Sequence, residues 1–257
     1  MAVLNVPVLD MTRLPRHVAV IMDGNGRWAE RRGLSRLEGH KRGKDSVRAV
    51  VETSRRLGIP YLSLFAFSTE NWQRPRREVS GLMRLLRHYL RTELGRLMKN
   101  EVRLVAIGDL DRLPEVVRRD LEETIEATRG NERLTVGFCV SYGGREDIVQ
   151  AARQLACEVQ AGRLRPEDID AAVFARRLGT SAFPDPDLLI RTSGEMRISN
   201  FFLWQMAYAE IYVTDILWPD FGEREFLTAL AHYQRRERRF GRTSEQREKK
   251  ERLRAAR

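Results

Sequence analysis

A short polar run near the N-terminus, Asp23-Gly-Asn-Gly-Arg-Trp28, has the composition of an anion-binding loop. Gly24 and Gly26 let the backbone turn sharply and bring its N–H groups close to a phosphate. Asp23 offers a ligand for a hard cation and Arg27 a guanidinium, and a diphosphate needs both. Gly-Asn-Gly is also an ordinary turn, which stays the alternative for the glycines taken alone. The run matches neither the Walker phosphate loop nor the dinucleotide fingerprint.

Two further sets of polar side chains suit anions. Arg36 and His40 are four residues apart at the start of an expected helix, so they share one face within reach of the loop. Charge on such a face is normally solvated, and that interpretation stays open for these two residues.

A second anion-binding set follows a later apolar run and consists of Arg191, Arg197 and Ser199. Glu210 lies beyond it and adds a carboxylate. Two arginine sets and two carboxylates, Asp23 and Glu210, indicate two anionic substrates and one hard cation. Mg2+ is the natural choice because it favours few carboxylates together with phosphate oxygens and retained waters.

A third cluster combines a hydroxyl, a carboxylate, an amide, an indole and a guanidinium within seven residues, from Ser68 to Arg74. Trp72 alone could cap the core. The whole mixture is hard to explain by packing, and we interpret it as a reaction zone. Its members are Ser68, Glu70, Asn71, Trp72 and Arg74.

Six β-rich runs predict the strands that must position these loops. They are His17 to Met22, Tyr61 to Phe67, Val102 to Ile107, Leu134 to Ser141, Leu188 to Arg191 and Ile211 to Leu217. Segments with apolar residues three and four apart predict helices around 47–57, 79–97 and 148–155, with a last helix over 223–239. This alternation predicts an α/β fold with a central, mostly parallel β-sheet of about six strands flanked by helices. Ligands of such sheets bind at the carboxyl ends of the strands, so the polar loops should converge on one rim.

The composition limits the classes of function. The chain has 257 residues, 42% of them apolar, which suffices for one domain with a sizeable core. The net charge is +10, but from Arg235 to Arg257 there are 11 Lys/Arg against 4 Asp/Glu, which leaves +3 for residues 1–234. A basic tail of this kind is typical of a solvated end. A nucleic-acid-binding protein is therefore a rival interpretation but not the favoured one.

The two cysteines, Cys139 and Cys157, form no CxxC pair and no metal-ligand cluster, so neither a disulfide framework nor a zinc site is expected. No segment approaches the roughly 18 to 20 apolar residues that a membrane span requires. The first twelve residues lack a signal-peptide pattern. We expect a cytoplasmic protein whose basic tail can contact an anionic membrane surface.

The motifs resemble, in the same order, the successive blocks of cis-prenyltransferases, and of the bacterial undecaprenyl diphosphate synthase family in particular. The blocks are HVAVIMDGNGRWA, GHKRG, FAFSTENWQRP, IGD, SYGGREDIVQA, LLIRTSGEMRISNFFLWQMAYAE and DILWPDF. Two adjacent aspartates occur nowhere in the chain, which disfavours prenyl synthases with a DDxxD motif. The resemblance implies one catalytic domain over residues 1–241, with an N-terminal extension over 1–14 and a basic tail over 242–257. It also implies a homodimer and an elongated hydrophobic tunnel beneath the diphosphate site.

The resemblance further implies an Mg2+-dependent condensation of isopentenyl diphosphate with an allylic diphosphate, either farnesyl or geranyl diphosphate. The implied product is a Z-polyprenyl diphosphate, the precursor of the lipid carrier for cell-wall synthesis. Asp23 and Asn71 would be catalytic, and Asp23 and Glu210 would be metal ligands. No nucleic-acid partner is implied. The implied substrate-binding residues are Gly24, Asn25, Gly26, Arg27, Trp28, Arg36, His40, Ser68, Thr69, Glu70, Trp72, Arg74, Arg191, Arg197, Ile198 and Ser199.

The family assigns proton acceptance to the position of Asn71, yet a neutral amide is a poor base. Our hypothesis is that a diphosphate oxygen takes the proton and that Asn71 only orients the acceptor.

The chain departs from the family pattern at Ser141, where asparagine is expected, and at Ser193, where glycine is expected. Phe138 and Val140 could crowd the tunnel, whereas the small Ala66 leaves room near its mouth. The product length therefore stays open. A synthase of short-chain or irregularly coupled cis-prenyl diphosphates is the close alternative.

Overall fold

The computed structural model describes residues 7–236, which surround one six-stranded sheet in the order β3-β4-β2-β1-β5-β6. Every neighbouring pair of strands is parallel. The predicted α/β fold and its parallel sheet are confirmed. The strands are β1 His17–Ile21, β2 Tyr61–Ser68, β3 Val102–Ile107, β4 Leu134–Tyr142, β5 Leu188–Arg191 and β6 Glu210–Val213.

The sixth strand is shorter than the expected run from Ile211 to Leu217. After Val213 the chain leaves the sheet and closes against the loop that follows β5. The N–H of Ser193 donates to the carbonyl of Ile216 at 2.9 Å, and the N–H of Gly194 donates to the carbonyl of Thr214 at 2.8 Å. Apolar residues beyond Val213 therefore pair with a loop instead of a strand.

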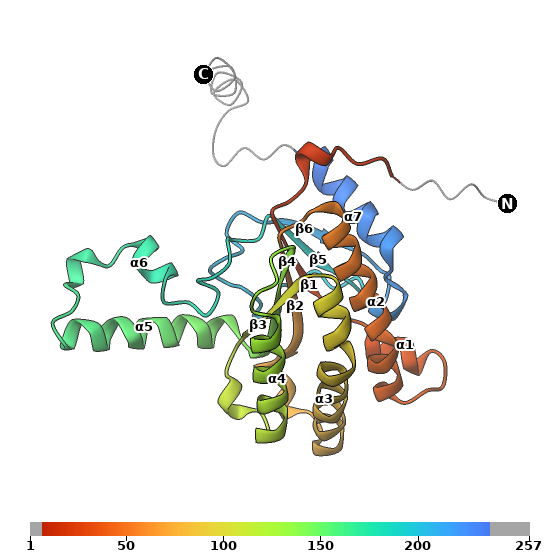
Figure 1. Cartoon of the computed structure of the whole chain (residues 1–257), viewed down its shortest axis with the longest axis horizontal. Helices are drawn as coiled ribbons and strands as arrows, with labels where there is room; N and C mark the ends of the chain where they lie inside the picture. The colour runs from red at the N-terminus through yellow and green to blue at the C-terminus, as the bar shows by residue number, and fades with distance from the viewer. Residues whose placement is uncertain (1–6, 237–257) are drawn as a thin grey trace, which may run out of the picture.

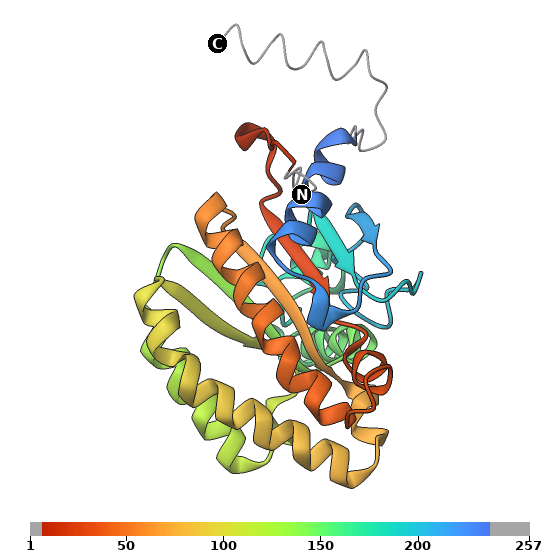
Figure 2. The ribbon, with the colours of Figure 1, turned by 90° about the vertical axis from the view of Figure 1, so that its right-hand side faces the viewer.

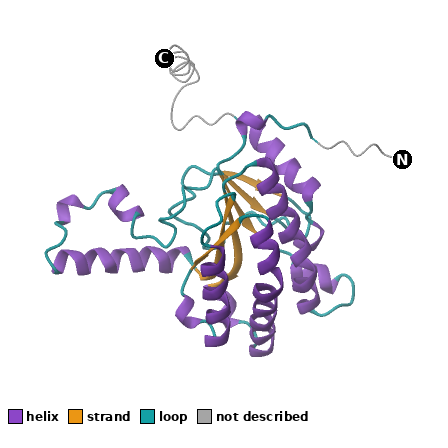
Figure 3. Cartoon of the chain, in the orientation of Figure 1, coloured by secondary structure: helices purple, strands orange, loops and turns teal. Residues whose placement is uncertain are grey.

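Helices cover the sheet, and α2, α3 and α4 stand together on one face of it (Figures 1 and 2). Helices α5 and α6 project away from the remainder of the molecule (Figure 3). The helices are α1 Asn25–Glu30, α2 Arg36–Leu57, α3 Arg76–Lys99, α4 Glu115–Thr128, α5 Gly144–Gln160, α6 Ala171–Ala175 and α7 Glu223–Arg235. None of the helices within residues 7–236 has the length and apolar character that crossing a bilayer needs.

The expected helices are present, and the structure adds α1, α4 and α6 to them. The last expected helix ends at Arg235, and the expected basic tail at 242–257 lies outside the described residues. Helix α4 was not singled out in the sequence, although Val117, Leu121 and Thr124 bury one face of it at helical spacing. Its many charged residues conceal that apolar stripe.

The central strand β1 is buried on both faces, and its side chains alternate between them. Val18 and Val20 join the core beneath the helices α2, α3 and α7, whereas Ala19 and Ile21 join a second core on the opposite face. This double burial explains why β1 reads as an unbroken apolar run. It also holds the end of β1 in place, and Asp23 lies two residues beyond that end.

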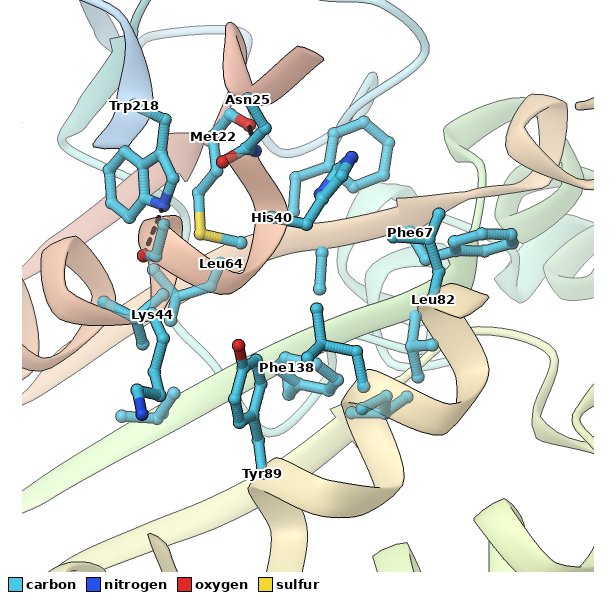
Figure 4. A pocket seen from close by; sticks show the side chains of 18 of the residues that line it. Met22, Asn25, His40, Lys44, Leu64, Phe67, Leu82, Tyr89, Phe138 and Trp218 are labelled. Carbon is cyan, nitrogen blue, oxygen red and sulfur yellow. Dashed lines mark hydrogen bonds between the residues drawn. The ribbon is translucent and has the colours of Figure 1, made fainter. Parts of the chain in front are cut away.

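Helix α2 approaches the loop after β1 so closely that two of its positions exclude side chains. A Cβ atom at Gly39 would lie 2.0 Å from the carbonyl oxygen of Asn25. At Gly43 it would lie 2.5 Å from Oδ1 of Asn25, and the carbonyl of Gly43 accepts a 3.0 Å hydrogen bond from Nε1 of Trp218 (Figure 4). The glycines of GHKRG thus set the distance between helix and loop.

We expect Gly39→Ala to lower the free energy of unfolding by roughly 1–3 kcal/mol, because the added methyl group meets a backbone carbonyl that cannot move alone. Gly95→Ala is the matched control, since this exposed position of α3 has open space around it. It should raise stability by about 0.5–1 kcal/mol. Urea unfolding followed by circular dichroism measures both, and equal midpoints would contradict the close approach.

Candidate active site

Asp23 and Arg191 meet because their strands are parallel neighbours. Ile21 in β1 is in register with Arg191, the last residue of β5, so Asp23 lies just beyond it. Oδ2 of Asp23 accepts hydrogen bonds from Nη2 of Arg191 at 2.9 Å and from Nη2 of Arg27 at 3.4 Å. Oδ1 accepts from the backbone N–H of Gly24 at 2.7 Å. The sheet thus brings together residues 168 positions apart in the sequence.

The carboxylate of Asp23 stays ionised in this setting. Burial raises the pKa of Asp23, but hydrogen bonds from Arg191 and Ser193 and the charge of Arg191 outweigh that effect and hold it below its usual value. About a third of the side chain remains exposed. Asp23 is therefore a negatively charged group that a ligand can still reach.

Arg191 organises the second anion-binding set from a buried position. Its side chain is only 4% exposed. Nη1 donates to the backbone carbonyl of Arg197 and, at 2.7 Å, to Oγ of Ser199. The three residues that the sequence grouped by type are thus one connected unit, and Arg191 joins it to Asp23.

Arg27 lies beside this unit and has partners that the sequence did not suggest. Its Nη2 donates to Oγ of Ser193 at 2.5 Å and its Nη1 to the carbonyl of the same residue at 3.2 Å. Glu195 forms ion pairs with Arg27 at 3.4 Å and with Arg197 at 2.5 Å. A carboxylate thus lies between two guanidinium groups that a diphosphate could also bind.

The first set of cationic residues flanks the same loop. The guanidinium of Arg36 packs directly on Gly26, where a Cβ atom would lie 2.8 Å from Cζ. It also forms a 2.7 Å ion pair with Glu30. Burial and the positive charge of Arg74 lower the pKa of His40 to about 4, so its imidazole is neutral at pH 7. His40 would therefore approach an anion as a neutral hydrogen-bond donor.

The predicted reaction zone forms the short 3-10 helix η2, Thr69–Gln73, at the end of β2. Oδ1 of Asn71 accepts from the backbone N–H of Ser68 at 3.1 Å. Glu70 accepts from Nδ2 of Asn200 at 2.8 Å, which ties this segment to the loop after β5. Trp72 packs edge-on against the core and donates to Oγ of Ser141 at 3.0 Å.

A cavity of about 810 Å³ opens beneath these residues. Polar side chains of the loops lie at one part of its wall. Helices α2 and α3 and the sheet supply mostly apolar side chains, and the two helices add the charged residues Lys44, Arg48, Glu52, Glu93 and Arg96. Figure 4 shows Asn25 and His40 on the side of α1 and α2, opposite Leu82 and Phe138. The apolar lining residues include Val47, Val51, Leu64, Ala66, Leu82, Leu85, Leu86, Leu97, Leu104, Val136, Phe138 and Val140. That the cavity is an elongated tunnel stays a prediction.

The structure brings most of the predicted residues to this cavity. Those in its wall are Asp23, Asn25, His40, Ser68, Glu70, Asn71, Arg74, Arg191, Arg197 and Ser199. Gly24, Gly26, Arg27 and Arg36 lie beside them through the contacts given above.

Four predicted substrate-binding residues have other surroundings. Trp28 donates to Asp220 at 2.7 Å and is covered by the guanidinium of Arg32, away from the cavity wall. Ile198 packs against the second core. Thr69 and Trp72 belong to η2 but do not line the cavity. Trp72 packs against the core, as expected if it caps the core.

Glu210 is not brought to Asp23 within one chain. It is the first residue of β6 and is in register with Leu188, so it lies at the amino edge of the sheet, whereas Asp23 lies at the carboxyl edge. There it forms a 3.7 Å ion pair with Arg236. The sequence places it near the second arginine set, but three residues of extended strand carry it away.

Of the two predicted metal ligands, Asp23 is the one that lines the cavity. Among the described residues, no group of three or more His, Cys, Asp or Glu is arranged to hold a metal ion. A cation at Asp23 would need further ligands from substrate and water. This agrees with the coordination preference of Mg2+, which binds few carboxylates and keeps several waters.

Sequence reasoning did not assign Lys44, Ser193, Glu195 or Asn200 to the site. Lys44 could have been found, because it lies four residues after His40 on the same helix face and lines the cavity. The other three belong to the loop after β5, and only its folded path shows which side chains turn inward.

Comparison with known proteins identifies this arrangement. A family model described as "Putative undecaprenyl diphosphate synthase" matches residues 21–241. The chain belongs to this prenyltransferase family. It is 55% identical over 233 residues to the isoprenyl transferase of Chlorobaculum tepidum, covering 91% of this chain and 88% of that protein. It is 52% identical to a ditrans,polycis-undecaprenyl-diphosphate synthase, (2E,6E)-farnesyl-diphosphate specific, of Legionella pneumophila, covering 91% and 98%.

The fold of this prenyltransferase agrees with that of a solved relative. It matches the crystal structure of lavandulyl diphosphate synthase from Lavandula x intermedia in complex with dimethylallyl diphosphate with a TM-score of 0.87 and 44% identity. The match covers 89% of this chain and 98% of that one. The family predicted from the motifs is confirmed, and the nucleic-acid rival is not favoured.

We expect Arg191→Lys to lower the unfolding free energy by roughly 1–3 kcal/mol, because one ammonium group cannot replace the fork that holds Asp23, Arg197 and Ser199. Prenyl transfer should fall at least about tenfold, because the guanidinium fork is lost. Arg197→Lys is the control for stability: its side chain is 65% exposed and should change stability by less than about 0.5 kcal/mol. Similar unfolding midpoints for the two variants would count against a buried organising role.

Proposed function

We propose that this prenyltransferase condenses isopentenyl diphosphate with an allylic diphosphate, farnesyl or geranyl, in an Mg2+-dependent reaction that yields a long Z-polyprenyl diphosphate. One observation carries the proposal. An ionised Asp23 and the guanidinium groups of Arg27, Arg191 and Arg197 lie together at an apolar cavity of about 810 Å³. Such a site suits a molecule with a diphosphate at one end and a hydrocarbon chain at the other.

The residues present fit a magnesium ion. Asp23 would hold it, and the diphosphate and water would complete its ligands. When bound, Mg2+ neutralises charge on the diphosphate leaving group. Within one chain the register of β6 separates Glu210 from Asp23, so the expected metal role of Glu210 stays a prediction.

The chain's own residues support the bond changes in order. Arg27, Arg191 and Arg197 stabilise the negative charge that develops as the allylic C–O bond breaks. The double bond of isopentenyl diphosphate then supplies the electron pair for the new C–C bond to the allylic carbon. A proton leaves the isopentenyl carbon next to the cation that results, and a new double bond forms. The same steps repeat as the chain grows into the cavity.

Asn71 suits an orienting role better than that of a base. Its Oδ1 already accepts from the N–H of Ser68, so the amide group is left as the donor that faces the cavity. A diphosphate oxygen then takes the proton, and the amide of Asn71 holds that acceptor in place.

The likeness to relatives specific for (2E,6E)-farnesyl diphosphate supports farnesyl diphosphate as the primer and a lipid-carrier precursor for cell-wall synthesis as the product. We also propose a cytoplasmic homodimer that contacts anionic membrane through its basic end. The charge surplus from Arg235 to Arg257 supports the membrane contact, since each basic residue near such a surface contributes about 1 kcal/mol.

The test is a product assay with labelled isopentenyl diphosphate and dimethylallyl, geranyl or farnesyl diphosphate as primer. We expect long-chain product that requires Mg2+, and a loss of kcat of about 100- to 1000-fold in Asp23→Ala. Asp111→Ala is the control, because this carboxylate is 90% exposed in the 3-10 helix Leu110–Arg112, outside the cavity wall. Product from dimethylallyl diphosphate without isopentenyl diphosphate would instead support irregular coupling.

Replacing the amide of Asn71 by a carboxylate separates the two roles of this residue. We expect Asn71→Asp to lower kcat by at least about tenfold, because a negative charge repels the diphosphate that a neutral amide orients. A pH–rate profile of the variant and the wild type measures this. Wild-type activity with an unchanged profile would make the orienting role untenable.

A further inference from the structure

Ser193 has a backbone conformation that glycine adopts without strain and that serine rarely adopts. Its φ is +79°, in the left-handed region, and the next residue, Gly194, has the same φ. A non-glycine residue held in such a conformation at a functional site indicates that its side chain contributes there.

The side chain of Ser193 lies between the two groups that define the site. Oγ accepts from Nη2 of Arg27 at 2.5 Å, and Ser193 also helps to lower the pKa of Asp23. The residue is 7% exposed, and its N–H is fixed by the carbonyl of Ile216 at 2.9 Å. Both the position and the direction of the hydroxyl are therefore set by the loop.

The direct contact of Arg27 with Asp23 is longer than its contact with the serine hydroxyl. Nη2 of Arg27 lies 3.4 Å from Oδ2 of Asp23, beyond the usual length of a charged hydrogen bond. The Arg27 side chain is 40% exposed, and its other contacts, with Glu195 at 3.4 Å and with the carbonyl of Ser193 at 3.2 Å, are also longer than 3 Å. The hydroxyl of Ser193 is therefore the nearest group that holds this guanidinium beside the carboxylate of Asp23.

We propose that the Ser193 hydroxyl is a positioning group that holds Arg27 against Asp23, so that guanidinium and carboxylate meet the allylic diphosphate in one fixed arrangement. The inference rests on the proposed function, because it assigns this arrangement to diphosphate binding. In a chain with glycine at this position, the carbonyl contact to Nη1 of Arg27 at 3.2 Å would remain. Nη2 would lose its nearest partner, and binding would have to restrict the guanidinium at an entropic cost.

Strain and hydroxyl can be separated by two substitutions at the same residue. Ser193→Gly removes both, whereas Ser193→Ala removes the hydroxyl and keeps the strain. Glu101→Gly is the matched control for relief of strain: Glu101 has a φ of +53° in the turn before β3 and does not line the cavity.

The measurements are the affinity for inorganic diphosphate without Mg2+ by calorimetry, KM and kcat for the allylic substrate, and the melting temperature. Both Ser193 variants should bind diphosphate about fivefold to tenfold more weakly and show a similar rise in KM, with a smaller change in kcat. Ser193→Gly should melt higher than Ser193→Ala, because only the former relieves the strain. Glu101→Gly should bind diphosphate like the wild type.

Two results would overturn the inference, and they differ in what else they overturn. If Ser193→Gly bound diphosphate and turned over substrate like the wild type, the positioning role would be wrong and the proposed function would stand. If the wild type bound no inorganic diphosphate and incorporated no isopentenyl diphosphate, both would be wrong. Asparagine at position 193 provides a rescue, since Ser193→Asn tolerates the conformation and restores a polar group. We expect it to recover part of the lost affinity.

Discussion

The ion pair between Asp23 and Arg191 is the contact on which the site depends. It joins the ends of two adjacent parallel strands, and Arg191 is almost completely buried while Asp23 is partly exposed. Separation of the two loops would leave the buried guanidinium of Arg191 without its carboxylate, so the pair opposes that separation. The pair thus sets the geometry in which Arg197, Ser199 and Arg27 assemble.

The negative and positive groups of the site form ion pairs with each other before any substrate is present. Asp23 and Glu195 pair with Arg27, Arg191 and Arg197, so the guanidinium groups are oriented by carboxylates. A diphosphate can replace some of these contacts without a large rearrangement. Orientation in advance of binding is the usual way in which a charged site gains affinity and stabilises a developing anion.

The apolar cavity and the charged rim are held together by the approach of α2. Gly39 and Gly43 let this helix contact the loop at Asn25, and Trp218 contacts the same part of the helix and donates to the carbonyl of Gly43. The same helix carries His40 at the rim and Val47 and Val51 deeper in the cavity wall. One rigid element therefore sets the distance between the diphosphate end and the hydrocarbon end of a substrate.

The sequence by itself determined the local parts of this protein. Apolar runs predicted six strands, and the polar loops after β1, β2 and β5 predicted which residues would share a rim, because parallel strands end at one edge. Motif resemblance predicted the family. These signals are readable since each depends on residues close together in the chain, whose periodicity or turn chemistry is fixed locally.

Only the tertiary structure decided which of those residues meet. Glu210 was grouped with Asp23 by residue type, yet the register of β6 places it at the opposite edge of the sheet. Ser193 showed only a departure from a pattern, and its contact with Arg27 exists because the loop after β5 folds back on residues 214–216. Contacts across 166 residues depend on strand order, register and loop path, which are set by the packing of the whole chain and not by any short stretch of it.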